Sequence, residues 1–204
     1  MTAKLFDLLD MNLFRQIRFL LRITRTHGIA RRYFVVNGFD GALTMLGIIM
    51  GFLISASADF TVIINACIGA AIALGVSGVS SAYVSEQAER RRALSQLEDA
   101  MVTDLKQSAH ADAARWVPIF IALVNGSAPL LISLIIILPL WLSNSGMVLF
   151  AQPLYLAIML AMLLIFLLGV FLGRISGISW LRSGLQTVFI ALLTVVLIYL
   201  FAGA

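Results

Sequence analysis

Five long apolar stretches, each interrupted by at most one charged residue, constrain the fold of this chain more than any other feature. They cover residues 33–58, 60–85, 116–142, 147–173 and 183–204. Each is long enough to cross a bilayer as a helix, which takes about 20 apolar residues. The mean hydropathy is +1.03 and only 12% of residues are charged, as in an integral membrane protein. The sequence therefore predicts an all-α membrane protein with five transmembrane helices.

The 14 Lys and Arg residues predict how these helices are oriented. Seven precede the first stretch, five lie between the second and third, and two lie between the fourth and fifth. Positively charged loops stay on the cytoplasmic side, so we expect a cytoplasmic N-terminus and a C-terminus outside. Topology also accounts for the net charge of +4, and no nucleic-acid partner is expected. If the source is prokaryotic, the expected location is the plasma (inner) membrane, with lipid as a partner.

The predicted organisation is a surface segment followed by a membrane domain. Residues 1–32 carry Leu and Ile at helical spacing beside a stripe of arginines, which predicts an amphipathic cytoplasmic surface helix. Residues 33–204 form the five-helix domain, with 86–115 as a short cytoplasmic helical extension. That extension has a narrow apolar stripe, expected to pair with the same region of another subunit. The stripe consists of Leu94, Leu97, Met101 and Leu105.

Asp40 is the only charged residue inside the first stretch. A carboxylate in the hydrocarbon region costs roughly 2.5 to 3.5 kcal/mol on insertion scales, so it normally faces a polar path or a partner. It belongs to a helical face of small and polar residues at spacings of 3, 4, 3 and 4, made of Asn37, Asp40, Thr44, Gly47 and Gly51. Small residues permit close helix packing, but packing alone needs no charge. We therefore expect something polar to pass Asp40.

The second stretch has a similar face and ends in carboxylates. Its small residues are Ala66, Ala70, Ala73, Ser77 and Ser80, and Glu86 and Glu89 follow. Two interpretations of the glutamates stay open. They pair with Arg90 or Arg92 at the membrane interface, or they form an oxygen-rich vestibule that concentrates divalent cations near Asp40. The candidate metal-contacting residues are Asp40, Asn37, Thr44, Ser77, Glu86 and Glu89.

Three segments carry a resemblance to a known family. Asn37-Gly38-Phe39-Asp40-Gly41, followed by Thr44 and Gly47, is similar to a DGxxT…G signature that opens a first span. Residues 77–86, with Tyr83-Val84-Ser85, resemble a second span that ends in Tyr-x-Ser, and residues 173–184 resemble a last loop and span. The family with these features is the vacuolar iron transporter family, in its short prokaryotic form without the cytoplasmic metal-binding domain.

The resemblance implies a homodimer built on the first two spans of each subunit and proton-coupled export of Fe²⁺ or Mn²⁺ from the cytoplasm. Asp40 would carry metal and protons, and the metal would be the transported substrate, with no resident cofactor. Aligned on Tyr83, the places where the family typically has a methionine and an acidic residue hold Gly78 and Ala82. The alternative is a non-transporting membrane scaffold or partner-binding protein that retains the fold. Since HExxH, GxSxG and P-loop motifs are missing from the sequence, we expect no enzyme.

Overall fold

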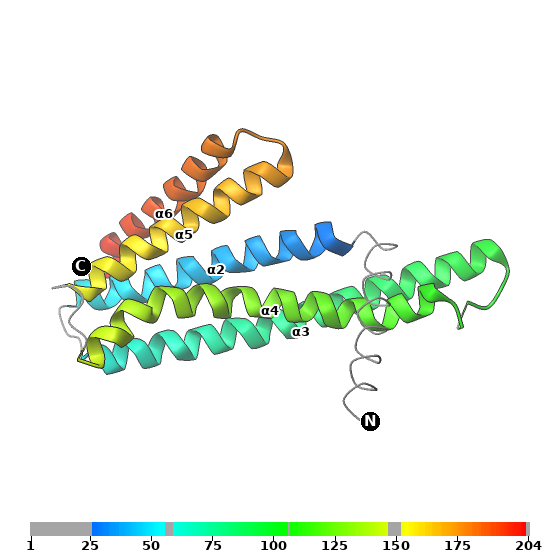
Figure 1. Cartoon of the computed structure of the whole chain (residues 1–204), viewed down its shortest axis with the longest axis horizontal. Coiled ribbons are helices and arrows are strands. Elements are labelled where there is room, and N and C mark those ends of the chain that lie inside the picture. The colour runs from blue at the N-terminus through cyan, green and yellow to red at the C-terminus, as the bar shows by residue number, and fades with distance from the viewer. Residues whose placement is uncertain (1–25, 56–58, 106, 147–151, 203–204) are drawn as a thin grey trace, which may run out of the picture. The chain divides into compact units, whose positions relative to one another are not determined.

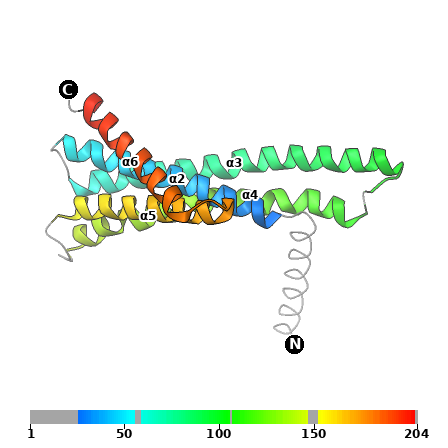
Figure 2. The same cartoon turned by 90° about the horizontal axis from the view of Figure 1, so that it is seen from above.

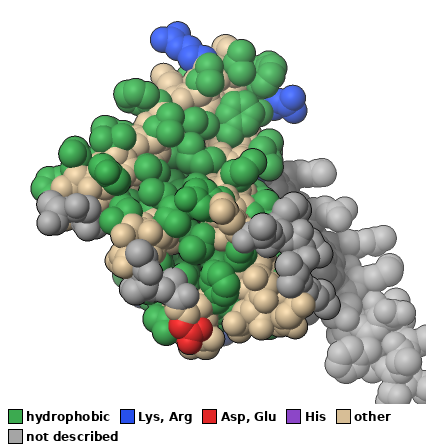
Figure 3. Space-filling view, turned by 90° about the vertical axis from the view of Figure 1, so that its left-hand side faces the viewer, with side chains coloured by type: hydrophobic (Ala, Val, Ile, Leu, Met, Phe, Trp, Pro, Cys, Tyr) green, Lys and Arg blue, Asp and Glu red, His purple; other side chains and the backbone are tan. Residues whose placement is uncertain are grey.

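The computed structural model of the chain describes residues 26–55, 59–105, 107–146 and 152–202. The regular structure in these ranges is all helical (Figure 1). The helices are α2 (Thr26–Ile54), α3 (Phe60–Met101), α4 (Ala109–Asn144), α5 (Pro153–Ser176) and α6 (Trp180–Ala202). All five are long and apolar enough to cross a membrane, which confirms the predicted five-helix fold. Hydrophobic side chains also make up most of the described surface in the end-on view of Figure 3.

The helices extend beyond the apolar stretches that predicted them. α2 starts at Thr26, so residues 26–32 belong to the first membrane helix, while the rest of the expected amphipathic segment lies outside the described residues. α3 has 42 residues, which corresponds to about 63 Å at 1.5 Å per residue. A single helix thus continues from the second apolar stretch into the polar sequence after Ser85, as the run of good helix formers predicts.

The chain divides into two compact units whose boundaries fall inside α2, α3 and α4. The first contains Met1–Tyr33 and Gly78–Asn125, and the second contains Phe34–Ser77 and Gly126–Ala204.

In the first unit, the end of α3 and the start of α4 form an antiparallel hairpin (Figures 1 and 2). Leu94 and Leu97 line a cavity of about 190 Å³ together with α4 residues that include Ala113. Leu94 and Leu97 of the apolar stripe therefore face α4 of their own chain, and pairing with a second subunit stays a prediction. Closer to the membrane, the Asn125 side-chain amide donates a 2.8 Å hydrogen bond to the Gly78 carbonyl.

In the second unit, two glycines allow α4 to lie very close to its neighbours. A Cβ atom added to Gly41 would be 2.8 Å from the Cα of Pro129, and one added to Gly75 would be 2.8 Å from Leu130 Cδ1. The first contact joins two backbones, so α2 and α4 touch there with no side chain between them. Close approach of this kind maximises van der Waals contact between membrane helices.

The helices α5 and α6 form a second close pair in the same unit. α5 ends at Gly177, which has a φ of 70° and donates its N–H to the Gly173 carbonyl, a glycine-dependent helix end. Gly173 packs on Ser183 of α6, and Gly169 packs on Thr187. The Thr187 hydroxyl contacts two carbonyl oxygens, 3.1 Å away at Ile165 and 2.8 Å away at Gly184. α6 is the most exposed spanning helix, with 11% of its span buried against 56% for α4.

The contact between Gly41 and Pro129 makes the first testable prediction. Gly41→Ala should destabilise the protein by about 1 to 3 kcal/mol, because the added methyl group meets a backbone that cannot move aside. Gly28→Ala is the matched control, since nothing lies within 4 Å of a Cβ added at Gly28 on the same helix. Thermal unfolding in detergent should show a lower melting temperature for the first variant only. Equal melting temperatures would mean that α2 and α4 are not held this closely.

Candidate functional site

Asp40 lies in the second unit on an exposed part of α2. Asn37 and Thr44 flank it one turn away in each direction and are partly buried. The residue after Asp40 is Gly41, whose backbone packs on Pro129. The tight crossing of α2 and α4 therefore holds the backbone beside Asp40 in place while the carboxylate itself stays accessible.

The predicted small-residue face of α2 is covered by another helix at Gly47 and uncovered at Gly51. A Cβ added to Gly47 would lie 3.7 Å from Ile198 of α6, whereas one added to Gly51 would have no neighbour within 4 Å. Gly47 is thus in contact with a helix of its own chain. Gly51 remains open to a partner.

The matching face of α3 is also largely uncovered. Ser77 is exposed, as are Ala66, Ala73 and Ser80, while Ala70 is partly buried. Gly69, which sequence reasoning did not include, has nothing within 4 Å of its added Cβ. The opposite face of α3 is the one that packs inside the second unit, through Ile63, Cys67, Ala71 and other buried residues. A face of small and hydroxyl side chains on a spanning helix is typical of helix association.

Glu86 is in the first unit and has partners within it. It is 8% exposed, its carboxylate lies 3.6 Å from the Nε of Arg90, and Tyr33 hydrogen-bonds to it through its hydroxyl. The ion pair with Arg90 that the first of the two interpretations expects is thus present for Glu86. Glu89, one turn along α3, is exposed.

The six predicted metal-contacting residues are divided between the two units. Within the described ranges, no group of three or more His, Cys, Asp and Glu side chains could hold a metal ion. Asn37, Asp40, Thr44 and Ser77 belong to the second unit, and Glu86 and Glu89 belong to the first. A single carboxylate with nearby amide and hydroxyl oxygens can act as a stepping point for a cation, but it cannot enclose one.

The sequence patterns did not single out two residues, Tyr33 in the first unit and Ser133 in the second. Tyr33 is the first residue of the first apolar stretch. A tyrosine at the end of one span is well placed to form a hydrogen bond with a glutamate at the end of another span. Ser133 of α4 is fully buried, and its hydroxyl has no hydrogen-bond partner among the described residues. No sequence signal distinguishes Ser133 from the other serines of the spans.

Comparison with known proteins gives a relative at moderate identity. A Methanocaldococcus jannaschii protein, described as "Uncharacterized protein MJ0645", is 32% identical over 176 residues, which cover 85% of this chain and 88% of that protein. The two proteins belong to one family. The similarity includes most of the membrane helices of the chain, since so large a share is aligned. No family model matches the chain, and no solved structure matches it either.

The surroundings of Glu86 predict a stability effect that separates it from Glu89. Glu86→Gln removes a charge that faces Arg90 in a mostly buried pair, so it should lower the free energy of unfolding by about 1.5 to 3 kcal/mol. Glu89→Gln alters an exposed side chain and should change it by less than about 0.5 kcal/mol. Thermal melts of the two variants, side by side, test this. If Glu86→Gln melted with the parent, the pair with Arg90 would not contribute to the fold.

Proposed function

We propose that this chain is a divalent metal cation transporter, a proton-coupled exporter of Fe²⁺ or Mn²⁺ similar to the vacuolar iron transporter family. The observation that carries the proposal is the exposed Asp40 carboxylate on α2, a helix apolar enough to cross a membrane. The Asp40 side chain has no hydrogen bond or ion pair to any other described residue. A carboxylate left against lipid would be unfavourable, so it needs either a polar pathway or a second chain beside it.

A homodimer supplies that environment in the proposal. The open positions on α2 and α3, among them Gly51, Gly69 and Ala73, form surfaces on which a second copy could pack closely. Two copies related by twofold symmetry would bring two Asp40 carboxylates toward a shared axis. Paired carboxylates with nearby Asn37 and Thr44 oxygens would provide the hard ligands that a single chain lacks.

In the proposed mechanism, ionised Asp40 accepts a partly dehydrated metal ion from the cytoplasmic side. Protonation of the same carboxylate from the opposite side removes its charge and releases the ion, which couples metal export to proton entry. Glu89 is exposed and could attract cations toward the pathway by raising their local concentration. Glu86 is bound to Tyr33 and Arg90, so we assign it to holding the hairpin and the start of α2 together.

A scaffold or partner-binding protein is the second candidate function, and one observation favours it. The described part of the chain has no group of acidic, cysteine and histidine side chains that could hold a metal, and Gly78 and Ala82 offer no ligands. Asp40 argues for transport instead, because a scaffold has no need of a charge inside a membrane helix.

Replacing Asp40 tests the proposed transport directly. Asp40→Asn keeps the size of the side chain and removes the charge, so the protein should still insert and fold, but metal-dependent proton flux should fall to the level of protein-free liposomes. The flux is measured in proteoliposomes with Fe²⁺, Mn²⁺, Co²⁺, Ni²⁺ and Zn²⁺ in turn.

Asp59→Asn is the matched control for this measurement. Asp59 is exposed just before α3, where its carboxylate accepts a 2.9 Å hydrogen bond from the Thr61 N–H. Asparagine fills this helix-start position equally well, so flux should stay at the parental level. Parental flux in Asp40→Asn would eliminate the proposed mechanism, and silence of the parent with every metal would favour the scaffold.

The proposed dimer makes a separate prediction at Gly69. Gly69→Leu places a bulky side chain on the open face of α3 and should lower the dimer fraction by blocking close approach. Gly28→Leu makes the same exchange at an open position of α2 outside this face and should leave the dimer fraction unchanged. Crosslinking in bilayers at a fixed protein-to-lipid ratio compares them. Gly47 is a poorer test position, because Ile198 of the same chain lies beside it.

A further inference from the structure

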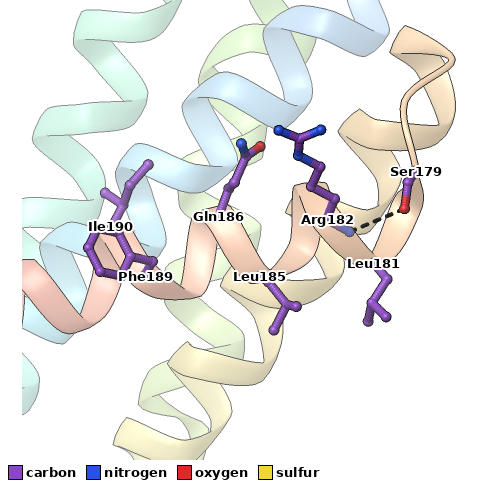
Figure 4. Close-up of a pocket in the computed structure, with 7 residues that line it drawn as sticks. All are labelled: Ser179, Leu181, Arg182, Leu185, Gln186, Phe189 and Ile190. Atoms are coloured by element: carbon purple, nitrogen blue, oxygen red, sulfur yellow. Dashed lines mark hydrogen bonds between the residues drawn. The ribbon is translucent and has the colours of Figure 1, made fainter.

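The surface of α6 and the turn before it form an elongated groove of about 700 Å³ (Figure 4). Ser179, Arg182 and Gln186 contribute the polar groups of the groove, and its apolar lining consists of Leu181, Leu185, Phe189 and Ile190. Arg182 and Gln186 extend from the same side of α6, one turn apart (Figure 4). None of these residues belongs to the proposed metal pathway.

The polar part of the groove carries the positive charge of Arg182, which no described residue neutralises. The sequence has no Asp or Glu after Asp112, and α5 and α6 contribute Arg174 and Arg182. Both arginines are exposed, and neither forms an ion pair within the described residues. The Ser179 hydroxyl oxygen accepts a hydrogen bond from the Arg182 backbone N–H at 3.5 Å, which leaves the hydroxyl proton available to a ligand oxygen.

The rest of the groove is suited to a hydrocarbon chain. Leu185 is 57% exposed and Phe189 is 67% exposed, although both lie on a helix apolar enough to span a membrane. From Arg182 to Ile190 the helix rises about 12 Å. That length is comparable to the roughly 15 Å of hydrocarbon in one leaflet. Trp180, 51% exposed, is the first residue of α6 and directly follows Ser179 of the groove in sequence, and exposed tryptophans of membrane proteins typically meet lipid headgroups.

We propose that this groove binds an anionic phospholipid. The lipid phosphate contacts the Arg182 guanidinium, with Gln186 and the Ser179 hydroxyl as further hydrogen-bond donors. One acyl chain lies along Leu185, Phe189 and Ile190. The charge of the headgroup distinguishes the lipids, because a zwitterionic headgroup brings its own cation close to Arg182, whereas an anionic headgroup does not. A surface arginine contributes about fivefold in affinity for an anionic membrane lipid.

The fluorescence of Trp180 can report on the lipid beside it. In a variant with Trp116→Phe and Trp141→Phe, Trp180 is the only tryptophan that remains of the three. The protein is placed in bilayers that contain phosphatidylglycerol or phosphatidylcholine brominated near the headgroup end of the acyl chain. We expect stronger quenching by the brominated phosphatidylglycerol at equal mole fraction. Arg182→Gln should reduce this preference about fivefold, and Arg182→Lys should retain most of it, because the charge remains.

Arg91→Gln is the control, since Arg91 is an exposed arginine on α3 outside the groove and should leave the preference unchanged. Elution volume and melting temperature show whether each variant is folded. Equal quenching by the two lipids in the parent would overturn the proposal, as would an undiminished preference in Arg182→Gln. Absence of quenching by both lipids would also overturn it, because no lipid would then lie beside Trp180.

Discussion

The backbone contact between Gly41 and Pro129 is the constraint from which the surroundings of Asp40 follow. Membrane helices gain little from the hydrophobic effect when they associate, since lipid is as apolar as leucine, so close packing has to supply the attraction. Glycine on α2 and proline on α4 allow that packing at one point, where an added Cβ would be 2.8 Å from the Pro129 Cα. The preceding residue, Asp40, thereby has a fixed backbone without being buried. A larger residue at position 41 would separate the helices and move the carboxylate with them.

The five helices could be predicted from sequence because an apolar stretch in a membrane has few structural solutions. Every backbone polar group must be satisfied internally, and a single segment can do this only as a helix. The bounds were less predictable. α4 begins at Ala109, seven residues before the apolar stretch at 116, because a helix continues into polar sequence for as long as its residues favour it. Hydropathy marks the apolar part of a helix and gives no information about a polar extension of the same helix.

The candidate site could be predicted only as far as local patterns extend. Asp40 stood out because one charge among apolar residues is visible in a linear sequence. For Glu86 the sequence allows both an ion pair and a cation vestibule. Its surroundings include Tyr33, a residue of another helix that hydrogen-bonds to it. The stripe of Leu94 and Leu97 likewise shows that a partner helix exists without showing which one it is. In each case the spacing along one helix defines a face, and only the tertiary fold identifies what covers it.

The hydrogen bond from Asn125 to the Gly78 carbonyl requires a particular side chain on α4 but only the main chain on α3. The acceptor belongs to the main chain, which every amino acid possesses, so no exchange of side chain at position 78 deletes it. The donor is a side-chain amide, and most exchanges at position 125 abolish it. The bond therefore depends on the identity of residue 125 of α4, whereas residue 78 of α3 contributes only its main chain.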